Sequence, residues 1–157
     1  MTADQGALAR LAEMPDELAA ALARAGTRLR ERPRQGGFSL LEHVWHLADL
    51  EREGFGARIA RLRGGGAPFL PDFDGDRAAR ERDYQARRAE EGLALFRRAR
   101  QDNLAALDAC TPAEWAHEGT QEHVGRVTLS DLPRLMREHD QSHRDEIAAL
   151  LRGWPAS

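Results

Sequence analysis

Residues 39–62 read SLLEHVWHLADLEREGFGARIARL, and this stretch decides the fold. Ser39 and Glu42 have the spacing of a capping box, which predicts a helix that begins at about Leu40. Glycines at 64–66 end the pattern. Between these signals, apolar residues recur at helical spacing, and they are Leu41, Val44, Ala48, Phe55, Ile59 and Leu62. The stretch therefore predicts one long amphipathic helix.

Three further segments show a helical period. Pro15 followed by two acids predicts a helix start, with a helix over about residues 15–29 and at most a short turn around residues 8–11 before it. A second helix is expected over about residues 77–107, with a break near residues 90–92. The last is expected to begin after Thr128 or Ser130 and to run to about Leu151.

The connections between these segments read as loops. Thr111 and Pro112 predict a short helical turn, and residues 119–127 read as a loop or a short extended pair. No alternating pattern is long enough to build a sheet. The chain is therefore predicted to be all-α, an antiparallel four-helix bundle with one long crossover.

Composition is that of a globular protein. The chain has 157 residues, of which 41% are hydrophobic and 31% charged, and we expect one domain over residues 1–157. No apolar run approaches the ~20 residues of a membrane helix, and no secretory signal is apparent. The single cysteine, Cys110, excludes an internal disulfide and fits a cytoplasmic location.

The charge balance argues against nucleic acid and membrane partners. The formal net charge is −3, which gives no general attraction to polyanions. All 23 basic residues are arginine, a bias that a GC-rich genome explains. The densest basic region, residues 77–100, is interleaved with acids and is interpreted as a solvated helix face with ion pairs.

Two histidines in the last predicted helix have the spacing of a pair of metal ligands. His139 and His143 are four residues apart, so both rings leave one face of the helix. Their face also carries Leu132, Met136, Ile147 and Leu150. A partly buried ring nitrogen without a partner costs ~1–3 kcal/mol, and one metal ion would satisfy both rings at once.

The helix at residues 40–62 offers a third imidazole. His43 and His46 are three residues apart, and their spacing alone leaves open which of them reaches the pair. Three histidines would leave an ion with an open position, as in catalytic sites. The alternative is that the rings are core hydrogen-bonders with no metal. His117 and His123 lie near predicted loops and are expected at the surface.

Several of these segments together resemble the DinB/YfiT-like superfamily of bacterial metal-binding four-helix bundles. The resemblance rests on four stretches in order: Arg32–Glu51, Thr111–Trp115, Gly125–Leu129 and Glu138–Ile147. It covers about residues 11–151. The stretches are short, and their order and spacing carry the resemblance.

The resemblance implies a site at His46, His139 and His143 for a divalent metal ion, zinc or nickel. It favours His46 over His43. Family members usually have glutamine three residues after the last histidine, where this chain has Glu146. A carboxylate at that position could orient His143, bind the metal or face solvent.

The resemblance also implies an activity. Known members include thiol-dependent transferases, such as bacillithiol S-transferases and a mycothiol-dependent maleylpyruvate isomerase. The expected function is thus metal-dependent transfer of a low-molecular-weight thiol to an electrophilic small molecule, by a homodimer. The alternative is a non-catalytic bundle that binds a metal or another ligand.

Five residues near the predicted site are candidate pocket neighbours. They are Trp45, Asp49, Leu50, Met136 and Glu146. Trp45 is expected to serve packing, and Asp49 to serve as a cap or an ion-pair partner. No catalytic base is assigned from the sequence.

Overall fold

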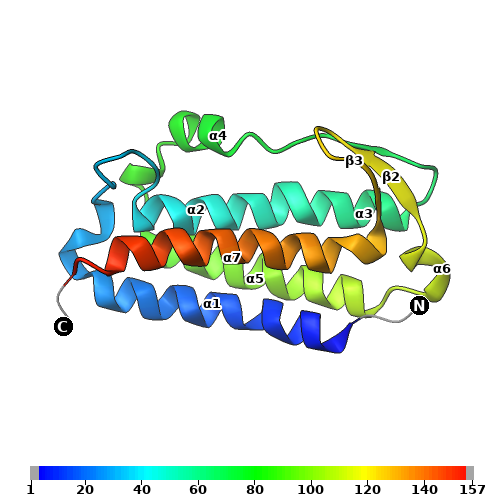
Figure 1. Cartoon of the computed structure of the whole chain (residues 1–157), viewed down its shortest axis with the longest axis horizontal. Helices are drawn as coiled ribbons and strands as arrows, with labels where there is room; N and C mark the ends of the chain where they lie inside the picture. The colour runs from blue at the N-terminus through cyan, green and yellow to red at the C-terminus, as the bar shows by residue number, and fades with distance from the viewer. Residues whose placement is uncertain (1–3, 155–157) are drawn as a thin grey trace.

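The computed structural model describes residues 4–154, and four long helical rods make up most of it (Figure 1). The first rod is α1 (Gln5–Ala25). The second is formed by α2 (Leu40–Asp49), η2 (Leu50–Gly56) and α3 (Ala57–Arg63), and the others are α5 (Ala89–Asp108) and α7 (Leu132–Leu151). Helix α1 packs on α5 and α7, and α2 packs on both of these helices too. The predicted four-helix bundle is confirmed.

Segment 64–88 is the long crossover. It returns along the length of the bundle, so α2 and α5 run in the same direction, whereas α2 and α7 run in opposite directions (Figure 1). The single crossover was predicted, and it makes one neighbouring pair of helices parallel.

Helix α1 begins ten residues earlier than predicted. Asp4 caps it by accepting from the backbone of Ala7, and Pro15 lies inside the helix. Leu8, Leu11 and Met14 are all buried, and they extend the apolar stripe ahead of the proline. Packing of this stripe compensates for the hydrogen bond that proline cannot make, so the predicted start at Pro15 is wrong. A 3₁₀ turn, η1 (Gly26–Arg30), follows α1.

The second rod begins as predicted. Ser39 accepts from the backbone of Glu42, and Glu42 accepts from the backbone of Ser39. Every residue of α2 is buried. In the middle of the rod, η2 is a π-helical segment of seven residues. Such segments are rare and occur frequently at functional sites.

The crossover is broken earlier than predicted. It holds α4 (Gly75–Glu81) and a 3₁₀ turn, η3 (Tyr84–Ala86), before α5 begins. Asp83 has a φ of 47° between them, which no continuous helix allows. The helix expected over residues 77–107 is therefore two helices, and the break lies at residues 82–88 instead of near residues 90–92.

A small sheet replaces part of the predicted loops. Strands β2 (Glu118–Gln121) and β3 (Gly125–Thr128) pair antiparallel, and β1 (Phe69–Leu70) pairs parallel with β2. The extended pair that was one of two readings is confirmed, while the expectation of no sheet is wrong. Strands of two to four residues are too short to show an alternating pattern.

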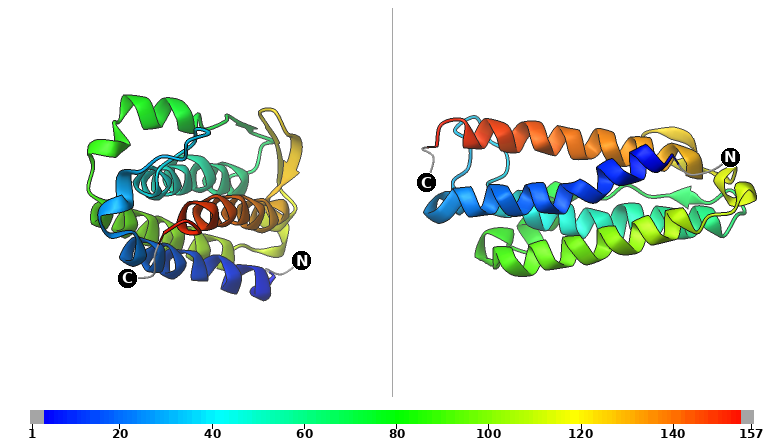
Figure 2. Two further views of the ribbon diagram at one scale, coloured as in Figure 1. Left: turned by 60° about the vertical axis from the view of Figure 1, so that its left-hand side comes forward. Right: turned by 90° about the horizontal axis from the view of Figure 1, so that it is seen from below.

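Sheet and crossover cover one side of the bundle. The hairpin and α4 lie on the same flank (Figure 2, left). The predicted turn after Thr111 is α6 (Pro112–Trp115), and η4 (Leu129–Asp131) leads into α7. None of the helices in residues 4–154 combines the length and the apolar character needed to cross a membrane.

Candidate metal centre

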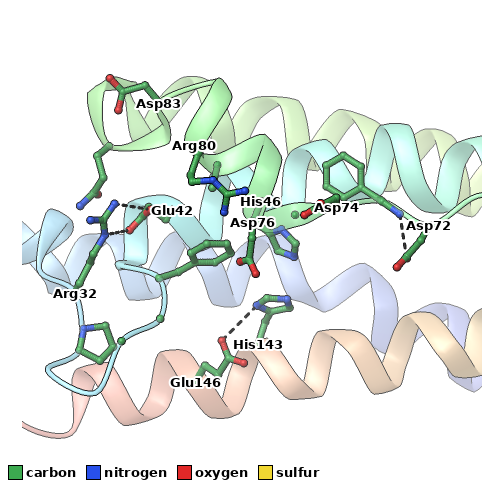
Figure 3. Close-up of a pocket in the computed structure, with 18 of the residues that line it drawn as sticks. Arg32, Glu42, His46, Asp72, Asp74, Asp76, Arg80, Asp83, His143 and Glu146 are labelled. Atoms are coloured by element: carbon green, nitrogen blue, oxygen red, sulfur yellow. Dashed lines mark hydrogen bonds and ion pairs between the residues drawn. The ribbon is translucent and has the colours of Figure 1, made fainter. Parts of the chain in front are cut away.

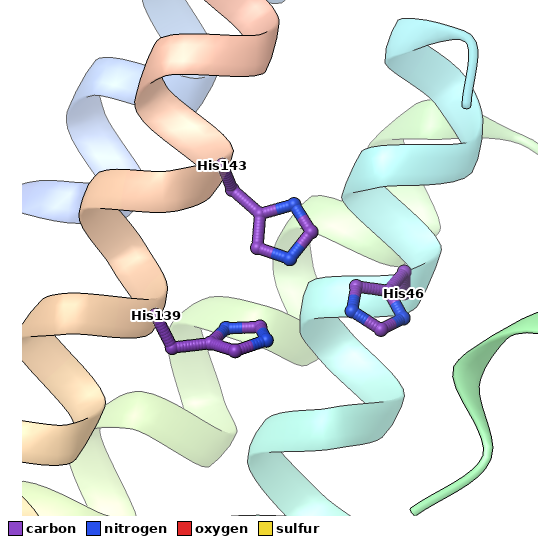
Figure 4. A group of neighbouring side chains, drawn as sticks. All are labelled: His46, His139 and His143. Atoms are coloured by element: carbon purple, nitrogen blue, oxygen red, sulfur yellow. The ribbon is translucent and has the colours of Figure 1, made fainter. Parts of the chain in front are cut away.

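Three histidines from two rods meet inside the bundle. His46 comes from α2, and His139 and His143 come from successive turns of α7 (Figure 4). One nitrogen from each ring lies within 4.8 Å of the other two. The ring centroids of His143 lie 4.6 Å from His139 and 4.8 Å from His46. The structure thus brings together the three residues that the sequence and the family resemblance indicated.

Aromatic side chains surround the trio. Phe38 lies 5.3 Å and Phe73 6.3 Å from the ring of His46, measured between centroids. Phe55 lies edge-on to His139 at 5.9 Å. These aromatic rings pack against the imidazoles and reduce their contact with water.

Burial keeps the imidazoles neutral. It lowers the pKa of His46 to about 3 and that of His143 to about 2, and the neighbouring rings add to both effects. Burial also lowers the pKa of His139. A neutral imidazole offers a nitrogen lone pair, which is the form that binds metal ions.

Two ring nitrogens of the trio lack hydrogen-bond partners. The Nδ1 atoms of His46 and His139 are buried and bond to no atom of residues 4–154. Gly75 lies against His46, and a Cβ there would stand 2.5 Å from the ring. Because buried polar groups are normally bonded, hydrogen bonding does not explain these rings. Neutral, converging and under-bonded imidazoles fit a divalent metal ion.

Glu146 belongs to a second group of side chains. Its Oε2 lies 3.5 Å from Nε2 of His43 and 3.9 Å from Nδ1 of His143. The potential ligand atoms of these three residues form a separate trio that shares only His143 with the first. Burial raises the pKa of Glu146. The carboxylate is therefore placed beside His43, on the Nδ1 side of His143.

A cleft of about 1100 Å³ reaches the trio. His46 and His143 lie in its wall, while the loop over residues 32–38 and the segment 72–80 form its sides (Figure 3). Charged residues line much of it, and they are Arg32, Arg34, Glu42, Asp72, Asp74, Asp76, Arg80, Asp83, Glu122 and Glu146. The cleft is large enough for a small-molecule substrate.

The other predicted pocket neighbours serve structure. Trp45 is buried and donates from its indole nitrogen to the carbonyl of Arg88. Asp49 accepts from the hydroxyl of Tyr84 and pairs with Arg82. Both readings favoured by the sequence, packing for Trp45 and ion pairing for Asp49, agree with these contacts.

Leu50 and Met136 belong to one hydrophobic cluster of the core. The two remaining histidines differ from each other. His123 is exposed as expected, whereas His117 is half-buried and bonds through Nδ1 to the carbonyl of Leu62 at 2.9 Å. The surface position expected for His117 is thus only partly correct.

A buried ion cluster lies next to the trio and was missed from the sequence. Arg100 on α5 bonds in parallel pairs to the carboxylates of Glu51 and Asp140, at 2.7–3.0 Å. Burial would lower the pKa of Arg100, yet the two carboxylates raise it above its ordinary value. The densest basic region was interpreted as solvated, and for Arg100 this is wrong. Its apolar-stripe position, with Phe96 and Leu107 at helical spacing, was the available signal.

A family model matches this chain in sequence, and a solved structure matches it in fold. The sequence model of the DinB superfamily matches residues 7–147. No curated protein matches the chain. The fold resembles that of YfiT from Bacillus subtilis with a TM-score of 0.86, at 22% identity, over 96% of this chain and 87% of YfiT. That structure is described as a probable metal-dependent hydrolase with an unusual four-helix bundle topology.

Proposed function

The chain belongs to the DinB superfamily, and on this basis we propose that it is a metal-dependent enzyme whose ion is held by His46, His139 and His143. One observation carries the proposal: three neutral imidazoles converge beside a cleft of about 1100 Å³. Three protein ligands leave a position of the ion for water or substrate. Zinc and nickel both suit imidazole ligands.

The reaction that we propose is transfer of a low-molecular-weight thiol to an electrophilic small molecule. A bound divalent ion would lower the pKa of the thiol and favour the nucleophilic thiolate. Phe38 and Phe73 would keep water from the reacting sulfur. Arg34 and Arg80 line the same cleft and form no ion pair within residues 4–154, so they suit a thiol that carries carboxylates.

Metal titration followed by a conjugation assay tests this function. Metal-stripped protein is titrated with Zn²⁺ and Ni²⁺ by calorimetry, and each loaded form is assayed with a panel of bacterial thiols and a chromogenic electrophile. We expect one ion per chain and thiol conjugation above the rate without protein. His139→Ala should abolish both, and His117→Ala, which changes a histidine outside the cleft, should abolish neither. Metal binding without conjugation for any thiol contradicts the transferase.

Hydrolysis is a second candidate, favoured by Glu146. Its carboxylate lines the cleft and burial raises its pKa, which suits a group that takes a proton from water. Ester and amide hydrolysis by the loaded protein, lost in Glu146→Gln while thiol conjugation is absent, would select this function. A loaded protein inactive in both assays would be a metal-binding bundle without catalysis.

A further inference from the structure

His43 contacts His143 but is not part of the first trio. It is 1% exposed and sits on α2, one turn before His46. The rings of His43 and His143 meet edge to face, with centroids 5.1 Å apart. Their Nδ1 atoms are 2.9 Å apart, which is a hydrogen-bond distance between two nitrogens. One of these two atoms must therefore donate and the other accept.

The carboxylate of Glu146 decides the direction. Its Oε2 lies 3.5 Å from Nε2 of His43, which is longer than a hydrogen bond but close enough for the negative charge to favour a proton on that nitrogen. The proton of His43 is thus drawn to Nε2. The ring is 1% exposed and packs against another imidazole, and both conditions favour the neutral form with this one proton. Its Nδ1 is then a bare acceptor.

It follows that Nδ1 of His143 is the donor. The neutral ring of His143 has one proton, and that proton is used toward His43. Its Nε2 is left with a free lone pair, and the rings of the first trio turn toward one another on that side (Figure 4). The chain runs from Glu146 through His43 to His143, in the order carboxylate, imidazole, imidazole.

We propose that His43 is a positioning residue, which accepts from Nδ1–H of His143, fixes that tautomer and aims Nε2 of His143 into the trio. The inference rests on the proposed function only in taking the trio as the place where an ion binds. Metal-binding histidines commonly bond their second nitrogen to an acceptor that fixes the ring. Here that acceptor is another imidazole, supported in turn by Glu146.

A second ion between His43, His143 and Glu146 is the competing reading of these contacts. Two nitrogens that bind one tetrahedral ion at 2.0–2.1 Å stand roughly 3.3 Å apart. The observed 2.9 Å between the Nδ1 atoms is shorter and matches a hydrogen bond. The distance therefore favours a hydrogen bond between His43 and His143 over a shared ion.

Nitrogen NMR of the metal-free protein tests the tautomer directly. Long-range ¹H–¹⁵N spectra distinguish a protonated Nδ1 from a protonated Nε2 in each ring. We expect His143 to be protonated at Nδ1 in the parent protein and in His43→Asn, because the asparagine oxygen can accept where Nδ1 of His43 stood. In His43→Leu the proton should move to Nε2. A His143 protonated at Nε2 in the parent, or unchanged in His43→Leu, overturns the proposal.

Zinc titration of the same variants supplies a second readout. Loss of a supporting hydrogen bond typically weakens metal affinity about 10–100-fold. We expect this loss in His43→Leu and near-parental affinity in His43→Asn, with both variants folded by circular dichroism. Equally weakened zinc affinity in both variants, or a second zinc equivalent that disappears in both, overturns the positioning role of His43. Absence of zinc binding in every protein would refute the proposed metal function and leave the tautomer result standing.

Discussion

Two polar clusters are buried side by side between α7 and the second rod, and they differ in how fully their hydrogen bonds are satisfied. Arg100 has five N–H donors, and all five find acceptors in Glu51, Asp140 and the carbonyl of Leu11. In the histidine trio, two Nδ1 atoms have no partner among residues 4–154. A saturated cluster has nothing left to bind, so Arg100 is structural. The unsaturated trio retains capacity for a ligand.

The two clusters are also connected along the chain. Asp140 follows His139 on α7, and Glu51 lies five residues after His46. Arg100 therefore ties together the two rods that carry the histidines, and its contact with Leu11 adds α1. We infer that the saturated cluster fixes the separation across which the unsaturated one must bind an ion.

The largest effect is expected from Arg100→Met. The substitution leaves two buried carboxylates without their partner, which costs about 3–5 kcal/mol of folding free energy. Arg97→Met is the matched control on the same helix, since Arg97 pairs with Asp16 at the surface and the pair is worth less than ~1 kcal/mol. Urea unfolding measures both. Similar losses in the two variants would remove the contrast between saturated and exposed ion pairs.

Metal addition should give the next largest effect. An ion that binds only the folded chain stabilises it by about 2.7 kcal/mol at a free concentration of 100 Kd. We expect this gain on adding Zn²⁺ to stripped protein, read as a rise in Tm. In His46→Ala the rise should vanish. A rise of the same size in that variant would place the ion elsewhere.

Low pH should lower the free energy of unfolding of the metal-free protein, because the buried histidines take up protons only when the chain unfolds. Their folded pKa values, about 3 for His46 and about 2 for His143, lie below the ordinary 6.5, so the unfolded chain binds more protons below pH 6.5. Stability is fully present above that pH and falls as pH drops, by up to ~1.4 kcal/mol per pH unit for each ring. Urea unfolding between pH 7 and 5 measures the slope. A flat profile would contradict neutral burial.

The smallest effect is expected from His139→Leu, which removes one under-bonded ring. The free energy of unfolding of the metal-free variant should be about 1 kcal/mol higher than that of the parent, because an unpartnered buried nitrogen is replaced by an apolar group that can pack on Phe55. Zinc should no longer stabilise it. Destabilisation of the metal-free variant would show that His139 is satisfied in the parent and would weaken the comparison.

Local signals allowed accurate sequence predictions, whereas contacts between distant residues did not. The capping box at Ser39 and the spacing of His139 and His143 each lie within one or two helical turns, and both appear as predicted. The choice of His46 over His43 came from the family resemblance, and the structure places His46 in the first trio.

The errors arise where tertiary contacts override local preference. Pro15 lies inside α1 because the flanking apolar stripe is buried. Strand β1 exists only because it pairs with β2, about 50 residues later. The partners of Arg100 lie 40 and 49 residues away along the chain. No periodicity within a segment can show such pairings.

The π-helical segment η2 gives the second rod one residue more than a regular α-helix would hold over the same turns. Its wider turns absorb that residue, so α2 and α3 on either side stay nearly in register. Deleting one residue from 50–56 would allow α-helical winding and leave His46 in place, while the side chains of the segment would shift. Glu51 belongs to this segment, so its pairing with Arg100 would change first. A lineage could therefore gain or lose this residue without moving the histidine that faces α7.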